Sequence, residues 1–209
     1  MKFEPEFKRA ISELPSAEKD KLIFRLLKHD LNLANKLLFE LVDTDTVDDK
    51  RAKMEIRIFK AVELMTQRFF SIGYLLMDLR YLSGEITEHV RITKDKFGDP
   101  YLNLVMLVKV LELNQKILKT KKFDESYTFN IYIVARVYKV LIQIQALHED
   151  FHMEFNDLLQ QLGNLFPKSD NLMRVAINNQ LDINWLLSCE IPSDIVAQHK
   201  YLRQEGFLK

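Results

Sequence analysis

The chain has few of the residues on which stapled, turn-rich or membrane-spanning proteins depend. It has one cysteine, Cys189, in 209 residues, so no disulfide can form within it and a reducing compartment is indicated. Gly and Pro number five each, too few for an all-β fold or a disordered chain. No run of about 18 uncharged apolar residues is present, so we expect no membrane span.

The charges balance, since 30 Lys and Arg stand against 30 Asp and Glu. A nucleic-acid-binding protein usually has a basic excess, so we expect no nucleic-acid partner. The start, MKFEPEFKRA, carries acids where a signal peptide needs an apolar run, so we expect a cytoplasmic protein without a membrane partner. With 47% apolar residues the chain can bury a core without staples.

Apolar residues recur at helical spacing along the whole chain, which predicts an all-α fold. We expect a bundle of long antiparallel helices with short helices at both ends. Residues 1–209 are predicted to form a single domain. Within it lie a short-helix N-terminal unit (1–45), a long-helix bundle (46–163) and C-terminal helices (164–209).

Cap residues predict where the N-terminal helices begin and end. The first helix should end before Pro15, Ser16 should cap the second and Asp30 the third. With tight corners between them, these three helices are expected to form a compact unit.

The long helices should follow the acidic segment "DTDTVDD" (43–49), because acids favour the positive end of a helix dipole. Gly73 marks the next turn, and Gly98 should end a fifth helix that runs to about residue 96. The longest helix is expected over 126–162, closed by Gly163. Its first half is rich in β-branched and aromatic residues and could be a strand, but its length favours a helix.

The stretch "ALHEDFHMEF" contains His148, Glu149 and His152 in the order H-E-x-x-H. On an α-helix the two histidines lie one turn apart and could both bind zinc, with Glu149 as general base on a zinc-bound water. A catalytic zinc also needs a third protein ligand. The extended motif would place Gly and His at positions held by Phe155 and Leu158, so an accidental match on a charged helix is favoured.

A second metal hypothesis involves the fifth helix, where Asp78, Glu85 and His89 lie close to one line at helical spacing, with Glu88 beside them. If this line faced the H-E-x-x-H histidines, a mixed carboxylate–imidazole site for Zn²⁺, Mn²⁺ or Mg²⁺ would result. The alternative is a charged outer face with ion pairs three or four residues apart.

The runs "LPSAEKDKLIFRLLKHDLNLANKLLFELVD", "GEITEHVRITKDKFG" and "CEIPSDIV" resemble an uncharacterised family of helical bacterial proteins. Some members are described as dUTP nucleotidohydrolases. The resemblance implies an all-helical nucleotide pyrophosphatase, in which E-x-x-E on one helix and E-x-x-D on a following helix hold Mg²⁺ against phosphates. Glu85 and Glu88 match the first motif, but the following helix has Glu112 and Gln115. Another E-x-x-D, formed by Glu40 and Asp43, precedes the first motif instead of following it.

Together these features favour a non-catalytic helical binding or assembly module, with a protein partner or a second copy of itself and no cofactor. The alternative is a metal-dependent hydrolase of a phosphate compound such as a nucleotide, using Glu85, Glu88 and His89, with or without the H-E-x-x-H residues. An H-E-x-x-H zinc peptidase is the third hypothesis.

Overall fold

The computed structural model describes residues 3–209, and all regular structure within them is helical, which confirms the all-α prediction. The chain divides into two units, Met1–Thr44 and Asp45–Lys209, each described here by itself. The first holds α1 (Pro5–Glu13), α2 (Ser16–His29) and α3 (Leu31–Leu41). The second holds α4 (Val47–Gln67), α5 (Ile72–Thr93), α6 (Gly98–Thr120), α7 (Phe123–Gln145), the 3-10 helix η1 (Glu149–Phe155), α8 (Asn156–Leu165), η2 (Phe166–Lys168), α9 (Asp170–Asn178), α10 (Asn184–Leu187) and α11 (Ile195–Gln204).

Proline or aspartate marks the start of each helix in the N-terminal unit: Pro5 is the first residue of α1, and Pro15 and Asp30 are the cap residues of α2 and α3. The Asp30 carboxylate accepts from the N–H of Leu33 at 3.0 Å, as expected of the cap of α3. The prediction for Ser16 is wrong, because Pro15 occupies the cap position and no side-chain cap bond forms. The Pro15 carbonyl already accepts from the N–H groups of Glu18 and Lys19. Ser16 is therefore the first residue of α2, whereas a Ser16 cap would place the start of the helix one residue later.

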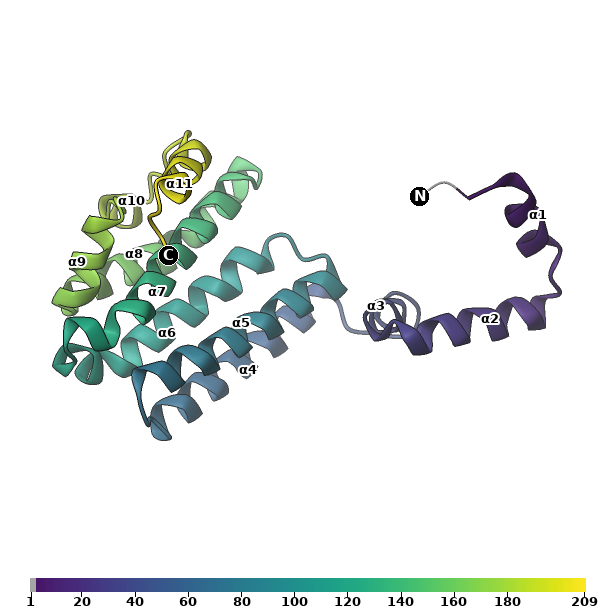
Figure 1. Ribbon diagram of the computed structural model, residues 1–209, viewed down its shortest axis with the longest axis horizontal. Coiled ribbons are helices and arrows are strands. Elements are labelled where there is room, and N and C mark those ends of the chain that lie inside the picture. Colours follow the sequence, from purple (N-terminus) through teal and green to yellow (C-terminus); the bar gives the residue numbers. More distant parts are fainter. Residues whose placement is uncertain (1–2) are drawn as a thin grey trace. The chain divides into compact units, whose positions relative to one another are not determined.

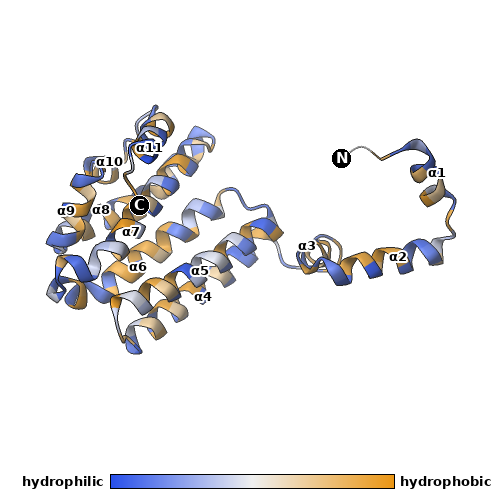
Figure 2. Ribbon diagram, viewed as in Figure 1, coloured by the Kyte–Doolittle hydropathy of each residue, from blue (hydrophilic) through white to orange (hydrophobic). Residues whose placement is uncertain are grey.

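The described part of the N-terminal unit encloses no buried core. None of residues 3–44 is buried. Figure 2 shows apolar and polar residues alternating around α1, α2 and α3. These helices are therefore amphipathic without enclosing their apolar faces.

The four long helices of the second unit pack side by side with short connections, as expected of antiparallel neighbours (Figure 1). Thr46 and Asp49 form a reciprocal capping box at the start of α4, so the acidic segment does start a helix. In α6 every residue from Leu102 to Val108 is buried, because α4, α5, α7 and α8 all pack against it. Within the described residues, no helix is long and apolar enough to cross a membrane.

The connection from α5 to α6 is held by an ion pair. α5 ends at Thr93 with Lys94 in the left-handed region (φ 57°), so it ends short of residue 96, and Gly98 starts α6 instead of ending α5. The buried Asp95 accepts two bonds from the Arg51 guanidinium, at 2.6 and 2.8 Å, and one from the N–H of Gly98. Arg51 also lies 4.8 Å above the ring of Phe97.

The expected single helix over 126–162 is wrong. Its first half is helical, as α7, but α7 ends at Gln145 and the chain continues through η1 into α8. Between them Phe151 and Phe155 turn onto the Phe97 ring, with centroids 5.8 and 4.9 Å away. This aromatic cluster accompanies the break that helical periodicity alone did not predict.

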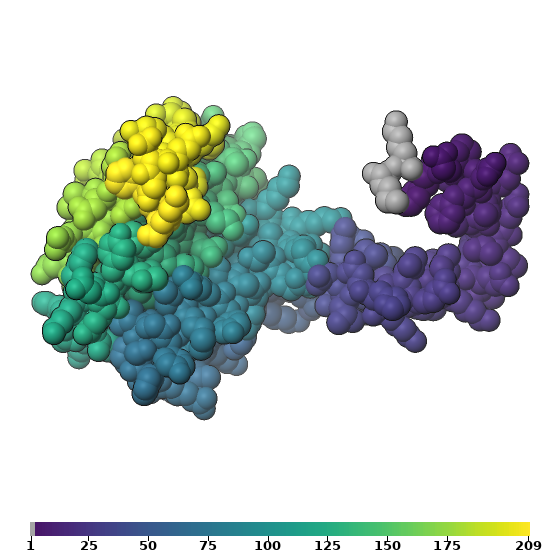
Figure 3. Space-filling model, in the orientation of Figure 1, coloured from purple at the N-terminus to yellow at the C-terminus, as the bar shows by residue number. Residues whose placement is uncertain are grey.

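Gly163 lies inside α8 and does not close a helix. A Cβ there would stand 2.9 Å from Leu187 Cδ2, so glycine allows α10 to approach α8. The C-terminal segment, yellow in Figure 3, lies over α7. Tyr138 of α7 donates to the carbonyl of Gln180 at 2.8 Å, and the Leu208 N–H donates to the Asn179 side chain.

Gly98→Ala is expected to lower the free energy of unfolding by about 2–3 kcal/mol, because breaking one side of a buried ion pair leaves an unpaired charge. A Cβ at Gly98 would lie 2.1 Å from Asp95 Oδ2 and 3.1 Å from Arg51 Nε. The matched control is Gly84→Ala in α5, where no atom lies within 4 Å of the added Cβ. The control should gain about 0.5–1 kcal/mol in urea unfolding, since alanine favours helix. Equal effects of both substitutions would contradict this role of the ion pair.

Candidate functional site

The H-E-x-x-H residues do not lie on an α-helix. His148 is the cap of η1, where its Nδ1 accepts from the Asp150 N–H at 3.4 Å and lies 3.1 Å from the Asp150 carboxylate. His152 Nε2 lies 3.3 Å from the carbonyl oxygen of Leu147 and can donate to it. With about three residues per turn in a 3-10 helix, side chains four apart point in different directions. The expectation that both imidazoles share one face is therefore wrong.

The acids of α5 lie in ion pairs with arginines. Glu85 accepts two bonds from Arg57 of α4, at 3.0 and 2.9 Å, and Glu88 accepts two from Arg91, at 3.1 and 2.6 Å. In residues 3–209 no group of three or more His, Cys, Asp or Glu is placed to hold a metal ion. Metal binding by Glu85, Glu88, His89, His148 and His152, with Glu149 as base, stays a prediction from the sequence.

His89 is the half-buried histidine of α5. Its Nε2 is buried and has no hydrogen-bond partner among the described residues. Burial lowers the pKa of His89 below 6.5, and the positive charges of Arg51 and Lys50 lower it further, while Asp95 opposes them. His89 therefore favours the neutral form beside the ion pair that holds the start of α6.

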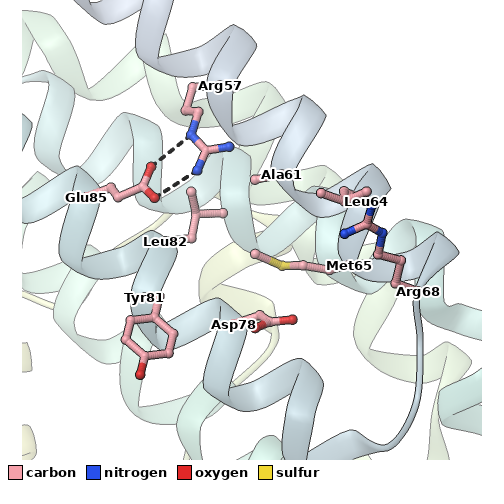
Figure 4. Close-up of a pocket in the computed structure, with 9 residues that line it drawn as sticks. All are labelled: Arg57, Ala61, Leu64, Met65, Arg68, Asp78, Tyr81, Leu82 and Glu85. Carbon is pink, nitrogen blue, oxygen red and sulfur yellow. Dashed lines mark hydrogen bonds and ion pairs between the residues drawn. The ribbon is translucent and has the colours of Figure 1, made fainter.

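Sequence reasoning missed a cleft between α4 and α5, which holds about 300 Å³ (Figure 4). Its floor is apolar, with Ala61, Met65 and Leu82, and the Arg57–Glu85 ion pair closes one end. Nine residues line this α4–α5 cleft: Arg57, Ala61, Leu64, Met65, Arg68, Asp78, Tyr81, Leu82 and Glu85. A floor of this kind suits an apolar side chain, and the charged rim suits polar groups beside it.

A second depression of about 370 Å³ adjoins the cleft and shares Tyr81 with it. Its other lining residues are Gly73, Leu76, Met77 and Arg80. Phe70 and Tyr74 at the start of α5 are also exposed, at 78% and 53%. Tyr, Met and Arg are the residues enriched at protein–protein interfaces, so this face has the composition of a protein-binding surface. The aromatic residues Tyr74 and Tyr81, which lie outside the buried stripe of α5, could have indicated this surface from the sequence.

The comparisons with known proteins give no match. Neither a family model, nor a curated protein, nor a solved structure matches this chain. Its function is therefore argued from its own residues.

We expect His148→Ala/His152→Ala to leave zinc binding unchanged, because within residues 3–209 no group of three or more His, Cys, Asp or Glu is placed to hold a metal ion. Metal content by mass spectrometry should show no stoichiometric zinc in either protein. Added Zn²⁺ should shift both melting temperatures equally. Stoichiometric zinc that disappears in the variant would restore the peptidase hypothesis.

Stability should decrease as pH falls below about 6.5, partly because of His89. The pKa of His89 is lower in the folded chain than in the unfolded chain. As pH falls, His89 of the unfolded chain is therefore protonated first, which stabilises the unfolded state relative to the folded one. His89→Gln should reduce the slope of the unfolding free energy against pH, in the range between pH 6.5 and the lower pKa that His89 has in the folded chain. Burial also lowers the pKa of His199, so His89→Gln/His199→Gln should reduce the slope further. An unchanged slope in both variants would contradict the assignment.

Proposed function

We propose that the protein is a non-catalytic assembly module, in which the N-terminal unit binds another protein chain through its apolar helix faces. One observation carries the proposal. Eleven large apolar side chains of this unit are between 37% and 77% exposed, while none of residues 3–44 is buried. They are Phe3, Phe7, Ile11, Ile23, Phe24, Leu26, Leu31, Leu33, Leu38, Leu41 and Val42.

Helix length supports the need for a partner. α1, α2 and α3 have 9, 14 and 11 residues. Isolated helices shorter than about 12–15 residues are marginal in water, and most of their stability in proteins comes from packing an amphipathic face. Domains below about 40 residues also rarely fold without oligomerisation, disulfides or metals. With no disulfide available to the chain, packing against another chain is the physical route to stable helices here.

The exposed side chains also make the unit a binding surface by composition. Fully burying a Leu, Ile or Phe side chain contributes about 1.5–3 kcal/mol, so covering these faces would stabilise the helices on a partner. Monomeric proteins seldom leave apolar patches of this extent in water. The α4–α5 cleft offers a second surface of similar chemistry in the other unit.

Leu31→Ser/Leu41→Ser should change the unfolding free energy of 45–209 by less than about 0.5 kcal/mol, because both side chains are more than 70% exposed. The matched control, Leu104→Ser/Leu107→Ser in α6, removes two fully buried side chains and should prevent stable folding. Urea unfolding followed by Trp185 fluorescence checks both.

Hydrogen exchange on the dilute full chain completes the test. Amides of 5–41 should exchange much faster than those of α6 and α7, because no described side chain of residues 3–44 is buried. Slow exchange of 5–41 in a monomer, or destabilisation of 45–209 by the α3 changes, would show that these faces belong to the fold itself and would overturn the proposal.

A further inference from the structure

The α4–α5 cleft contains one pair of charged side chains that bind each other and one pair that do not. Arg57 and Glu85 are joined by two hydrogen bonds, at 3.0 and 2.9 Å. Arg68, the cap residue at the end of α4, and Asp78 of α5 also line the cleft. Neither of these two forms an ion pair with another described residue. The cleft therefore offers one positive and one negative group to a ligand.

These two groups lie at the same end of the cleft. Figure 4 shows Arg68 and Asp78 on either side of Met65, at the end away from the Arg57–Glu85 pair. Asp78 is half-buried, whereas Arg68 is exposed. A carboxylate that loses part of its hydration without gaining a partner is destabilised, so a cation that reached Asp78 would bind favourably. The group that complements Arg68 is an anion.

The floor of the cleft beside these charges is apolar. It consists of Ala61, Met65 and Leu82, of which Ala61 and Leu82 are 5% and 1% exposed. A volume of about 300 Å³ is at the lower end of the range for small-molecule pockets, so the cleft suits a small ligand. Such a ligand should join a short apolar chain to one cation and one anion.

We propose that the α4–α5 cleft binds a free amino acid with an apolar side chain, such as L-leucine. Its carboxylate pairs with Arg68, its ammonium group with Asp78, and its side chain lies on the apolar floor. A guanidinium binds a carboxylate through two parallel hydrogen bonds, and an ammonium group is a strong donor to a carboxylate. An amino acid carries both charges on one carbon atom, so a single molecule presents both to this end of the cleft. This site belongs to the second unit and does not depend on the proposed role of the first.

The charge pattern favours a free amino acid over a peptide. Within a peptide both backbone groups are neutral amides, so an interior residue would cover the floor but leave Arg68 and Asp78 without ionic partners. An amino acid with a charged side chain would carry that charge onto the apolar floor, where burial without a partner is costly. Glycine would supply both charges but bury no side chain. An aliphatic amino acid meets all three requirements.

Titration of the full chain with L-leucine, followed by amide chemical shifts in NMR spectra, tests the site. The shifts should saturate with a dissociation constant of about 1 mM, as expected for a ligand of so few atoms, and should be largest within residues 57–85. Glycine should bind at least about tenfold more weakly, because it leaves the floor uncovered. Shifts that do not saturate by about 50 mM L-leucine, or equal binding of glycine, would overturn the proposal.

Matched variants and ligands test the two ionic contacts separately. Arg68→Gln should weaken the binding of L-leucine about tenfold and leave that of L-leucinamide, which lacks the carboxylate, unchanged. Asp78→Asn should weaken the binding of L-leucine about tenfold and leave that of N-acetyl-L-leucine, which lacks the ammonium group, unchanged. The control is Arg80→Gln, because Arg80 is exposed on α5 and lines the neighbouring depression instead of the cleft. It should bind L-leucine as the wild-type chain does.

The same ligands test the contacts on the wild-type chain, so the result does not depend on the folding of any variant. L-leucinamide and N-acetyl-L-leucine should each bind the wild-type chain about tenfold more weakly than L-leucine. N-acetyl-L-leucine methylamide lacks both charges. If it bound as tightly as L-leucine, the cleft would recognise only an apolar group and the proposal would be wrong. A variant that weakened L-leucine and its matched derivative equally would exclude the ionic contact assigned to that side chain.

Discussion

The Arg51–Asp95 ion pair determines where α6 enters the bundle, and the rest of the second unit is arranged around α6. Asp95 is 4% exposed and uses its carboxylate both for the Arg51 guanidinium and for the N–H of Gly98 at the start of the helix. Breaking this arrangement would leave a buried charge without its partner, which is far more costly than losing a surface pair. Four helices, α4, α5, α7 and α8, pack on α6. A shift in the position of the start of α6 would therefore change the packing of all four.

The two units differ in how much of their apolar surface is buried. In the second, the first half of α6 is enclosed, since every residue from 102 to 108 is buried. In the first, three amphipathic helices leave their apolar faces uncovered. This difference in burial between the two units is the observation from which we propose a partner for the N-terminal faces.

The residues of the motifs that first suggest chemistry take part in helix capping and helix pairing. His148 caps a 3-10 helix, and His152 contacts a backbone carbonyl beside the same turn. Glu85 and Glu88 form bidentate ion pairs with Arg57 and Arg91. Arg57 and Glu85 join α4 to α5 and close one end of the α4–α5 cleft (Figure 4). Residue types suited to metal binding thus serve helix capping and helix pairing, because carboxylates and imidazoles are equally good partners for arginine and backbone groups.

The sequence alone predicted the helical class, the cap at Asp30 and the helix that follows the acidic segment 43–49, because periodicity and capping act within a few residues. It did not determine the break between α7 and α8 or the place of Gly163, which depend on packing with Phe97 and Leu187 from distant segments. The α4–α5 cleft was hidden for the same reason, since its lining comes from two helices whose register only tertiary packing decides. The uncovered N-terminal faces needed the structure too, because periodicity identifies an apolar face but not whether the chain itself buries it.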